Sequence, residues 1–131
     1  MDASALVEYL LRTPRAGIVQ SVLEDSGVDL HAPSLCDVEV ASAFRRALLG
    51  GLMKERRTAL ALEAYLDLPL ARHGHEGLME RALAIRDNFT AYDAMYVALA
   101  GRVGGELLSA DAGFVRAARR HTDLEVVSAA V

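Results

Sequence analysis

Four acidic residues stand at the edges of apolar segments, where a carboxylate contributes little to the stability of the fold. This acidic quartet consists of Asp2, Glu39, Asp93 and Asp111, and no member has a Lys or Arg three or four positions away. A helical ion pair therefore explains none of them. Carboxylates that converge from distant segments repel one another unless cations hold them together. Because hard divalent ions prefer carboxylate oxygens, the acidic quartet predicts a metal site.

Three members of the acidic quartet also have a purely structural explanation. Asp93 follows Thr90 at the spacing of a capping box, and Asp2 and Asp111 each stand where a helix N-cap is expected. Taken singly, each of these three is explained more simply as a cap. Glu39 differs because it lies inside a predicted helix with no nearby partner, and charged groups are rarely buried unpaired. The functional interpretation therefore depends on the four acids meeting in space.

Composition limits the class of protein. The 131 residues suit one domain, and 53% hydrophobic with 24% charged residues exclude a disordered chain. A net charge of -4 argues against nucleic-acid binding by bulk positive charge, although bound metal ions would reverse the local field at an acidic site. No apolar run approaches the roughly 20 residues that span a bilayer. The single cysteine, Cys36, excludes an internal disulfide and favours a cytoplasmic location.

Hydrophobic periodicity predicts helices that alternate with short apolar strands. The predicted helices cover residues 3–12, 15–24, 34–49, 54–67, 76–88, 90–103 and 111–120, and the predicted strands cover 28–32, 68–72, 106–109 and 124–127. This order predicts an α/β sandwich with a short parallel sheet covered by helices. In such folds ligands bind beyond the carboxyl ends of the strands, and Asp111 follows the apolar pair Leu107–Leu108 closely.

The helix predicted over residues 34–49 has two notable features. Ser34 and Asp37 have the spacing of a capping box, with Ser34 as the expected N-cap. Apolar residues extend nearly all round the helix, since Val38 and Leu49 widen an arc that contains Cys36. We therefore expect a mostly buried helix, in which Glu39 needs some compensation for its charge.

Four motifs in this order resemble the PIN-domain ribonucleases, and in particular the VapC-type toxins of bacterial toxin–antitoxin pairs. The motifs are Asp2-Ala-Ser-Ala-Leu-Val-Glu8, Ala32-Pro-Ser-Leu-Cys-Asp-Val-Glu39-Val-Ala-Ser-Ala-Phe-Arg-Arg46, Thr90-Ala-Tyr-Asp93-Ala-Met-Tyr-Val-Ala-Leu-Ala100 and Leu107-Leu-Ser-Ala-Asp111. The resemblance extends over essentially the whole chain. It implies a single PIN-like domain over residues 1–131, folded as a three-layer sandwich with a short parallel sheet between helices.

The resemblance also implies an activity. An Mg²⁺- or Mn²⁺-dependent endoribonuclease would use the acidic quartet as its catalytic and metal-binding residues, with Asp2 and Asp93 as the principal ligands. Ser4 and Ser109 match the hydroxyl positions beside the first and last acids, where they would orient carboxylates or metal-bound water. The implied partners are an RNA substrate, a VapB-type antitoxin that silences the site, and a second copy of the chain in a homodimer.

One departure from the family concerns the start of the chain. Members usually have a short apolar strand before the first Asp, whereas only Met1 precedes Asp2 here. We expect this first strand to be missing or truncated, or to be encoded upstream of Met1. Either case affects how Asp2 is held in position.

Two other functions fit the same residues. A PIN-like module could bind RNA or an antitoxin without cleavage, or an acid cluster could hydrolyse small phosphoesters. Arg45, Arg46 and Arg116 are candidates for phosphate contacts, although a solvated surface role is the simpler explanation for each. The motif His73-Gly-His75 has too few ligands for a zinc site and is expected in an exposed loop.

Overall fold

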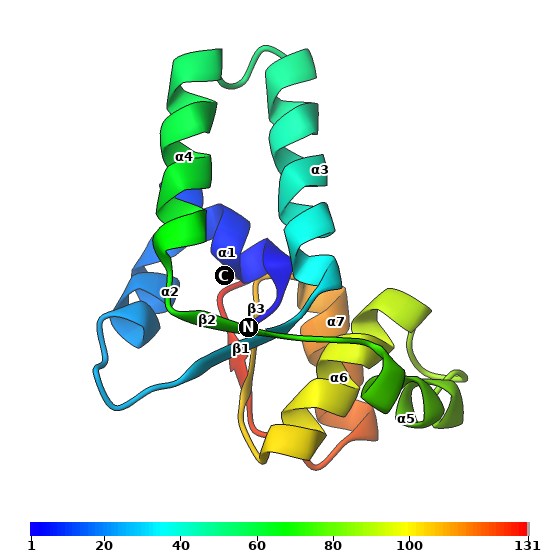
Figure 1. Cartoon of the computed structure of the whole chain (residues 1–131). Helices are drawn as coiled ribbons and strands as arrows, with labels where there is room; N and C mark the ends of the chain where they lie inside the picture. The colour runs from blue at the N-terminus through cyan, green and yellow to red at the C-terminus, as the bar shows by residue number, and fades with distance from the viewer. Residues whose placement is uncertain (131) are drawn as a thin grey trace.

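The computed structural model describes residues 1–130, which is all of the predicted domain except its last residue. Helices and short strands alternate along the chain, as the periodicity predicts (Figure 1). In chain order the elements are α1 (Ala3–Leu10), α2 (Ala16–Leu23), β1 (Leu30–Pro33), α3 (Leu35–Leu49), α4 (Glu55–Asp67), β2 (Leu70–His73), the 3₁₀ turn η1 (Glu76–Leu78), α5 (Met79–Ala84), α6 (Ala91–Val103), β3 (Leu107–Ser109), α7 (Ala112–His121) and β4 (Val126–Ser128).

The strands pair in parallel, which confirms the predicted α/β class, but within residues 1–130 they form two separate two-stranded sheets. β1 pairs with β2 in a register that begins with Leu30 opposite Leu70. β3 pairs with β4 in a register that begins with Leu107 opposite Val126. The first two residues lie between the sheets. The Met1 amino nitrogen donates to His31 O of β1 at 3.1 Å, and the Asp2 amide donates to Leu108 O of β3 at 2.9 Å.

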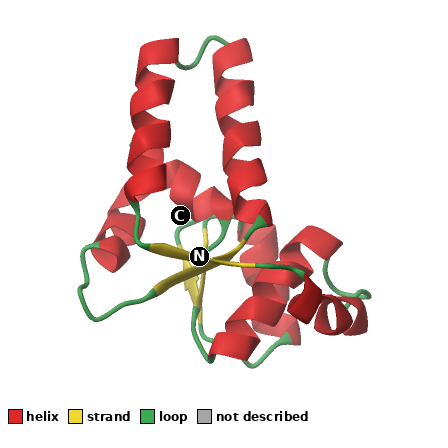
Figure 2. Cartoon of the chain, viewed as in Figure 1, coloured by secondary structure: helices red, strands yellow, loops and turns green. Residues whose placement is uncertain are grey.

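The strands lie at the centre of the molecule with helices around them (Figure 2). α1 contacts β3, α3 contacts β1, and α6 contacts both strands. The main core combines side chains from these elements, including Leu6 of α1, Val40 of α3, Val97 of α6 and Leu107 of β3. α6 is buried along most of its length from Ala94 to Ala100, because small and aliphatic residues follow one another there. This central helix carries Asp93 in its first turn.

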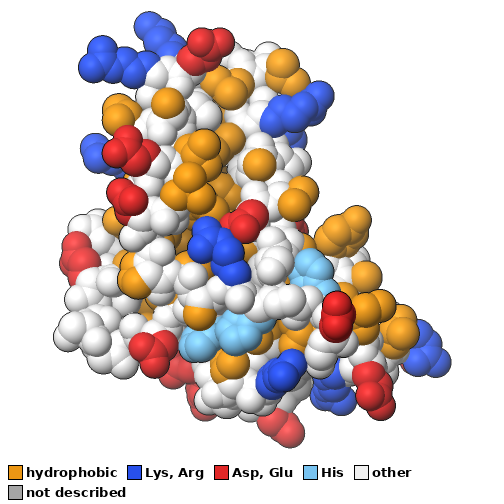
Figure 3. All heavy atoms as spheres, viewed as in Figure 1, with side chains coloured by type: hydrophobic (Ala, Val, Ile, Leu, Met, Phe, Trp, Pro, Cys, Tyr) orange, Lys and Arg blue, Asp and Glu red, His pale blue; other side chains and the backbone are white. Residues whose placement is uncertain are grey.

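α3 and α4 project from the body as a pair of helices (Figure 1). One face of α3 is buried through Cys36, Val40 and Phe44, whereas Val38 and Leu49 remain 70% and 72% exposed. The prediction that α3 is mostly buried is therefore wrong. The pair extends beyond the strands (Figure 1), and within residues 1–130 no other element covers the outward faces of its helices. Apolar side chains consequently gather on the surface over α3 and α4 (Figure 3).

The predicted capping box at the start of α3 is also wrong. The Ser34 side chain makes no cap bond and instead donates to His73 O at 3.1 Å. Asp37 accepts hydrogen bonds from Tyr65 Oη at 2.6 Å and from Arg72 Nε at 2.8 Å. β2 and α4 thus provide partners that the local sequence does not reveal.

Two further differences concern the segment after β2. The helix predicted over residues 76–88 is divided into η1 and the short α5, and the regular helix ends at Ala84. His73 belongs to β2 and not to an exposed loop, and its Nε2 lies 2.8 Å from Nδ1 of His31. His75 is also partly buried, and its Nε2 accepts the Leu35 amide at 3.0 Å. Across residues 1–130, every helix is too short or too polar to cross a membrane.

Candidate functional site

Asp2 is the N-cap of α1, and three hydrogen bonds hold its carboxylate. Oδ1 accepts Ser4 Oγ–H at 2.7 Å and the Ala5 amide at 3.1 Å, while Oδ2 accepts Ser109 Oγ–H at 2.6 Å. Only 5% of Asp2 is exposed, and this burial raises the pKa of its carboxyl even though the three bonds act in the opposite direction. The cap explanation for Asp2 is correct, but two of its three bonds go beyond what a cap requires.

Ser4 and Ser109 connect Asp2 to the end of β3. Their hydroxyl oxygens lie 3.3 Å apart. Ser4 Oγ accepts the Ala110 amide, and Ser109 Oγ accepts the Asp111 amide, both at 3.0 Å. Each hydroxyl therefore donates to Asp2 and accepts from the backbone that leads into α7. These bonds fix the Asp2 carboxylate relative to Asp111, although residues 2 and 111 lie near opposite ends of the chain.

Glu39 lies half-buried on α3, where its Oε1 accepts the hydroxyl of Tyr96 at 2.7 Å. Burial raises the pKa of the Glu39 carboxyl, the Tyr96 hydrogen bond lowers it, and the negative charge of Asp2 raises it further. Tyr96 is a buried residue of α6. Sequence reasoning missed it, although Tyr96 follows Asp93 by three positions and such spacing places two side chains on one face of a helix.

Asp93 lies half-buried in the first turn of α6. Its amide donates to Thr90 Oγ1 at 3.1 Å, so Thr90 caps the helix as predicted. Burial and the negative charges of Asp111, Asp2 and Glu39, in that order, raise the pKa of the Asp93 carboxyl to about 6. Asp93 therefore lies within electrostatic reach of the other three acids. Hydrogen bonds connect Asp2 through Ser109 to Asp111, and Glu39 to Tyr96 one turn after Asp93 on α6.

Asp111 is the exposed member of the acidic quartet. Its Oδ1 accepts the Phe114 amide at 3.0 Å, which makes it the N-cap of α7. It comes two residues after Ser109, the last residue of β3, and therefore stands beyond the carboxyl end of a parallel strand, where ligands bind in α/β folds.

The acidic quartet is a set of neighbours and not a ready-made ligand shell. Among residues 1–130, no three His, Cys, Asp or Glu side chains are close enough together to hold a metal ion as they stand. Uncompensated carboxylates repel one another, and hydroxyl donors engage Asp2 and Glu39. The chemistry of the donor set still fits Mg²⁺ or Mn²⁺, since both take carboxylate oxygens and keep several waters that bridge to more distant ligands.

Other predicted residues lie at the periphery. Arg45, Arg46 and Arg116 are exposed, and Arg46 donates to Ser42 Oγ within its own helix at 3.0 Å. Cys36 is fully buried beside Tyr65 and Tyr96, and its thiol pKa is raised by burial, which agrees with a core role.

Comparison with known proteins finds similar sequences over nearly the whole chain. A model of the PIN domain matches residues 1–120. Ribonuclease VapC12 of Mycobacterium tuberculosis is 33% identical over 128 residues, which cover 98% of each chain. Ribonuclease VapC3 of the same organism is 37% identical over 118 residues, covering 89% of this chain and 85% of its own. Ribonuclease VapC1, also from that organism, is 34% identical over 128 residues, which cover 97% of this chain and 96% of its own.

Proposed function

Because this chain belongs to the PIN-domain family, we propose that it is a VapC-type endoribonuclease toxin that hydrolyses RNA phosphodiester bonds. The match spans nearly the whole chain, and its relatives carry the name ribonuclease. The observation that carries the proposal for the site is the pair of serine hydroxyls that joins the buried Asp2 carboxylate to the backbone of Asp111. The pKa of Asp93, raised by burial and by the charges of Asp111, Asp2 and Glu39, supports it. Burial and like charge both disfavour ionised carboxylates at these positions, so the cluster favours a role in binding cations.

The acidic quartet would hold Mg²⁺ or Mn²⁺, with Asp2 and Asp93 as principal ligands and the other two acids direct or through water. When bound, such an ion activates water and offsets the charge that develops on the phosphate oxygens. Ser4 and Ser109 would orient the Asp2 carboxylate, and the Tyr96 hydroxyl would orient Glu39 through the bond to Oε1. The amino end of α6, next to Asp93, would favour the approach of a phosphate group.

A cleavage assay tests this function. Purified protein should cut RNA internally when Mg²⁺ or Mn²⁺ is present, and a chelator should stop the reaction. Asp93→Asn should abolish cleavage while it leaves the fold intact. If Asp93→Asn cuts RNA as fast as the parent, the role assigned to Asp93 is wrong. Binding of RNA without cleavage at any metal concentration would favour the alternative of a non-catalytic PIN-like module, and turnover of nucleotide monophosphates would favour a phosphohydrolase.

The proposed partners include a VapB-type antitoxin that inhibits the site and a second copy in a homodimer, in a cytoplasmic setting. The exposed apolar side chains on α3 and α4 support protein partners, since exposed apolar patches mark interaction sites. Four of these side chains, Val38, Leu49, Leu60 and Leu66, belong to the two helices, and the exposed Leu52 lies in the loop between them. Co-expression with the neighbouring reading frame, followed by size measurement of the purified complex, tests both partners. A chain that stays monomeric and binds no product of that frame would contradict this part of the proposal.

A further inference from the structure

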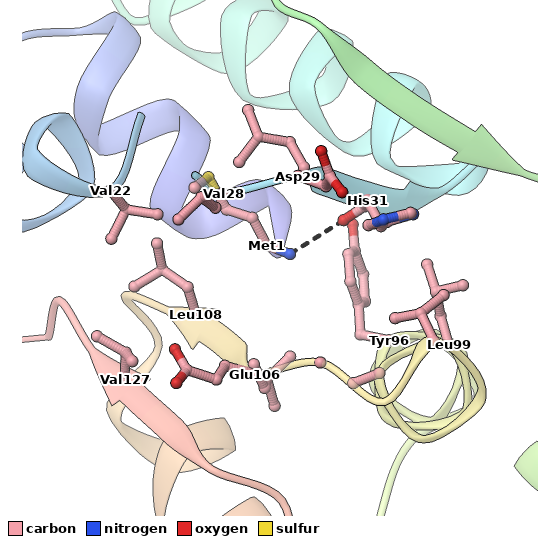
Figure 4. A pocket seen from close by; sticks show the side chains of 15 residues that line it. Met1, Val22, Val28, Asp29, His31, Tyr96, Leu99, Glu106, Leu108 and Val127 are labelled. Carbon is pink, nitrogen blue, oxygen red and sulfur yellow. Dashed lines mark hydrogen bonds between the residues drawn. The ribbon is translucent and has the colours of Figure 1, made fainter. Parts of the chain in front are cut away.

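Two of the hollows on the protein surface differ in chemistry. The cleft between the two sheets, about 300 Å³ in volume, is lined mainly by apolar side chains such as Val22 and Leu108 (Figure 4). A larger hollow of about 760 Å³ lies among η1, α5, α6 and the end of α7. Three arginines line this second hollow, Arg81 of α5, Arg102 of α6 and Arg120 of α7, and we call them the arginine triad.

The guanidinium groups of the arginine triad have no partner among residues 1–130. The two ion pairs in that range involve other arginines, and no carboxylate oxygen there lies within 4.0 Å of the triad, although Asp123 also lines the hollow. Arg86 and Arg119 differ, because each donates to a main-chain carbonyl oxygen at 3.0 Å. Each guanidinium carries five donors and a permanent charge, so three of them without acceptors favour the binding of an anion.

A structural explanation accounts for only part of this arrangement. Arg102 and Arg120 stand in the last turns of α6 and α7, where a positive charge complements the helix dipole. The Arg102 guanidinium, however, extends from its own helix to η1. A Cβ atom at Gly77 would lie 3.2 Å from Cζ of Arg102 and closer still to Nη1. The absence of a side chain at Gly77 therefore leaves the space that this guanidinium occupies in the wall of the hollow.

The hollow lies away from the acidic quartet. Arg102 follows Asp93 by nine residues on α6, and Arg120 follows Asp111 by nine residues on α7. Nine residues correspond to about 14 Å along a helix and to about two and a half turns. Each arginine is therefore near the opposite end and on the opposite face of its helix from the acid that precedes it. A group bound in the hollow does not take part in chemistry at the acidic quartet.

A phosphate group is the anion that suits the arginine triad. Guanidinium groups bind phosphate oxygens through pairs of parallel hydrogen bonds. The protein carries a net charge of -4, and the acidic quartet without cations repels RNA. Because the affinity of proteins for nucleic acid comes largely from neutralised phosphates, this protein needs a local basic site to hold an RNA strand.

We propose that the arginine triad binds a backbone phosphate of RNA at a distance from the bond that is cleaved. The inference rests on the proposed function in taking RNA as the source of the phosphate. Phosphate contacts of this kind hold and orient a nucleic acid without reading its sequence. The arginine triad therefore contributes to the affinity for RNA and not to the chemical step.

RNA binding in the absence of cleavage tests the proposal. A fluorescently labelled RNA hairpin with single-stranded flanks is titrated with the full chain in the presence of a chelator, and anisotropy gives the Kd. Arg102→Gln and Arg120→Gln should each raise the Kd about 10-fold and reduce the salt dependence of log Kd by about 0.7–1. Arg56→Gln removes the same charge from the exposed surface of α4 and should change neither quantity. Equal Kd values for all three variants would overturn the proposal.

A substitution at Gly77 moves Arg102 without a change of charge. Gly77→Ala places a Cβ atom where the guanidinium lies, so it should raise the Kd, although less than Arg102→Gln does. Gly17→Ala is the matched control, because a Cβ atom there meets nothing within 4 Å, and it should leave the Kd unchanged. A Gly77→Ala protein that binds RNA as tightly as the parent would overturn the role assigned to Arg102.

Cleavage kinetics separate a failure of this inference from a failure of the proposed function. With Mg²⁺, Arg102→Gln and Arg120→Gln should raise KM and leave kcat unchanged. A lower kcat at saturating RNA would overturn the assignment to binding alone. If the parent cleaves no RNA but the two variants still bind it more weakly, the proposed function fails and the phosphate site stands. If inorganic phosphate raises the Tm of the parent but not of Arg102→Gln, while both bind RNA equally, the ligand is a free anion and the assignment to RNA is overturned.

Discussion

The Asp2 carboxylate accepts three hydrogen bonds in a buried position, whereas the Asp93 carboxylate lies half-buried among three other acids. Ser4 and Ser109 hold the first in one orientation. Burial, together with repulsion from its neighbours, raises the pKa of the second to about 6. Within one site, therefore, neutral donors fix the Asp2 carboxylate, which we call the fixed half. The Asp93 carboxylate, which we call the open half, is left electrostatically unfavourable. Such a difference suits a site in which the fixed half defines the geometry and the open half depends on a cation.

The largest effect should follow from neutralising the open half. Asp93→Asn removes a carboxylate that the proposed reaction requires, and we expect RNA cleavage to fall by about 1,000-fold. Because the substitution also removes like-charge repulsion, the Tm of the metal-free protein should stay equal or rise. Cleavage assays and thermal unfolding measure the two effects.

Asp67→Asn, which changes an exposed acid at the end of α4, is the matched control and should alter neither quantity. A marked loss of Tm in Asp93→Asn would mean that Asp93 stabilises the fold as Asp2 does, and that the two carboxylates do not differ in role.

A substitution in the fixed half should lower the stability of the protein, in contrast to Asp93→Asn. Ser109→Ala removes a donor to Asp2 Oδ2 and an acceptor for the Asp111 amide, and Ser109 is fully buried. We expect a loss of about 1–3 kcal/mol in the free energy of unfolding and a decrease of about 10–100-fold in cleavage. Denaturant unfolding and kinetics test this, with the exposed Ser21→Ala as control. Unchanged stability in Ser109→Ala would refute the contrast between the two halves.

Much of this site could be predicted from the sequence, because its acids belong to local patterns. Asp2, Asp93 and Asp111 each stand at a helix start that the surrounding residues define. The partners of Glu39 and Asp37 could not be predicted in the same way. Tyr96 lies 57 residues from Glu39, and Arg72 lies 35 residues from Asp37. Such contacts depend on how the strands and helices assemble, which periodicity does not specify.

The fold shows the same division between local and long-range features. Strand and helix positions follow from apolar runs and breaks, such as Gly104, whose positive φ of 69° ends α6. The exposure of Val38 and Leu49 was not predictable, because apolar residues all round a helix normally indicate burial. The separation into two sheets was likewise not predictable, because periodicity locates strands but does not specify which of them pair.

Tyr96→Phe tests how much the hydroxyl bond to Glu39 contributes. We expect about a 10-fold lower kcat with little change in KM, because the carboxylate would lose its orientation without a change in RNA contacts. Tyr65→Phe is a matched control, since it removes a hydroxyl bond to Asp37 away from the acidic quartet. An equal loss of activity in both variants would indicate general destabilisation and not orientation of Glu39.

The smallest effect concerns the pH dependence of stability without metal. The ordinary pKa of an aspartate carboxyl, 3.8, applies to Asp93 in the unfolded chain, whereas its pKa in the folded protein is about 6. At a pH between these two values the native state therefore binds more protons than the unfolded state. The free energy of unfolding should therefore fall as pH rises from about 4 to about 6. The raised pKa values of Asp2 and Glu39 act in the same direction.

Thermal unfolding in the presence of a chelator, repeated across this pH range, measures how steeply stability falls with pH. This fall should be smaller in Asp93→Asn than in the parent protein. A stability that rises with pH in both proteins would contradict the assigned electrostatics.

The central claim is that the acidic quartet converges to bind divalent cations. Anomalous diffraction from crystals grown with Mn²⁺ tests it most directly, because it locates the ion independently of activity. We predict a Mn²⁺ peak in contact with Asp93 and near the other three acids, and its loss in Asp93→Asn. A protein that cleaves RNA with Mn²⁺ while the ion binds elsewhere, or binds equally well in Asp93→Asn, would contradict the account.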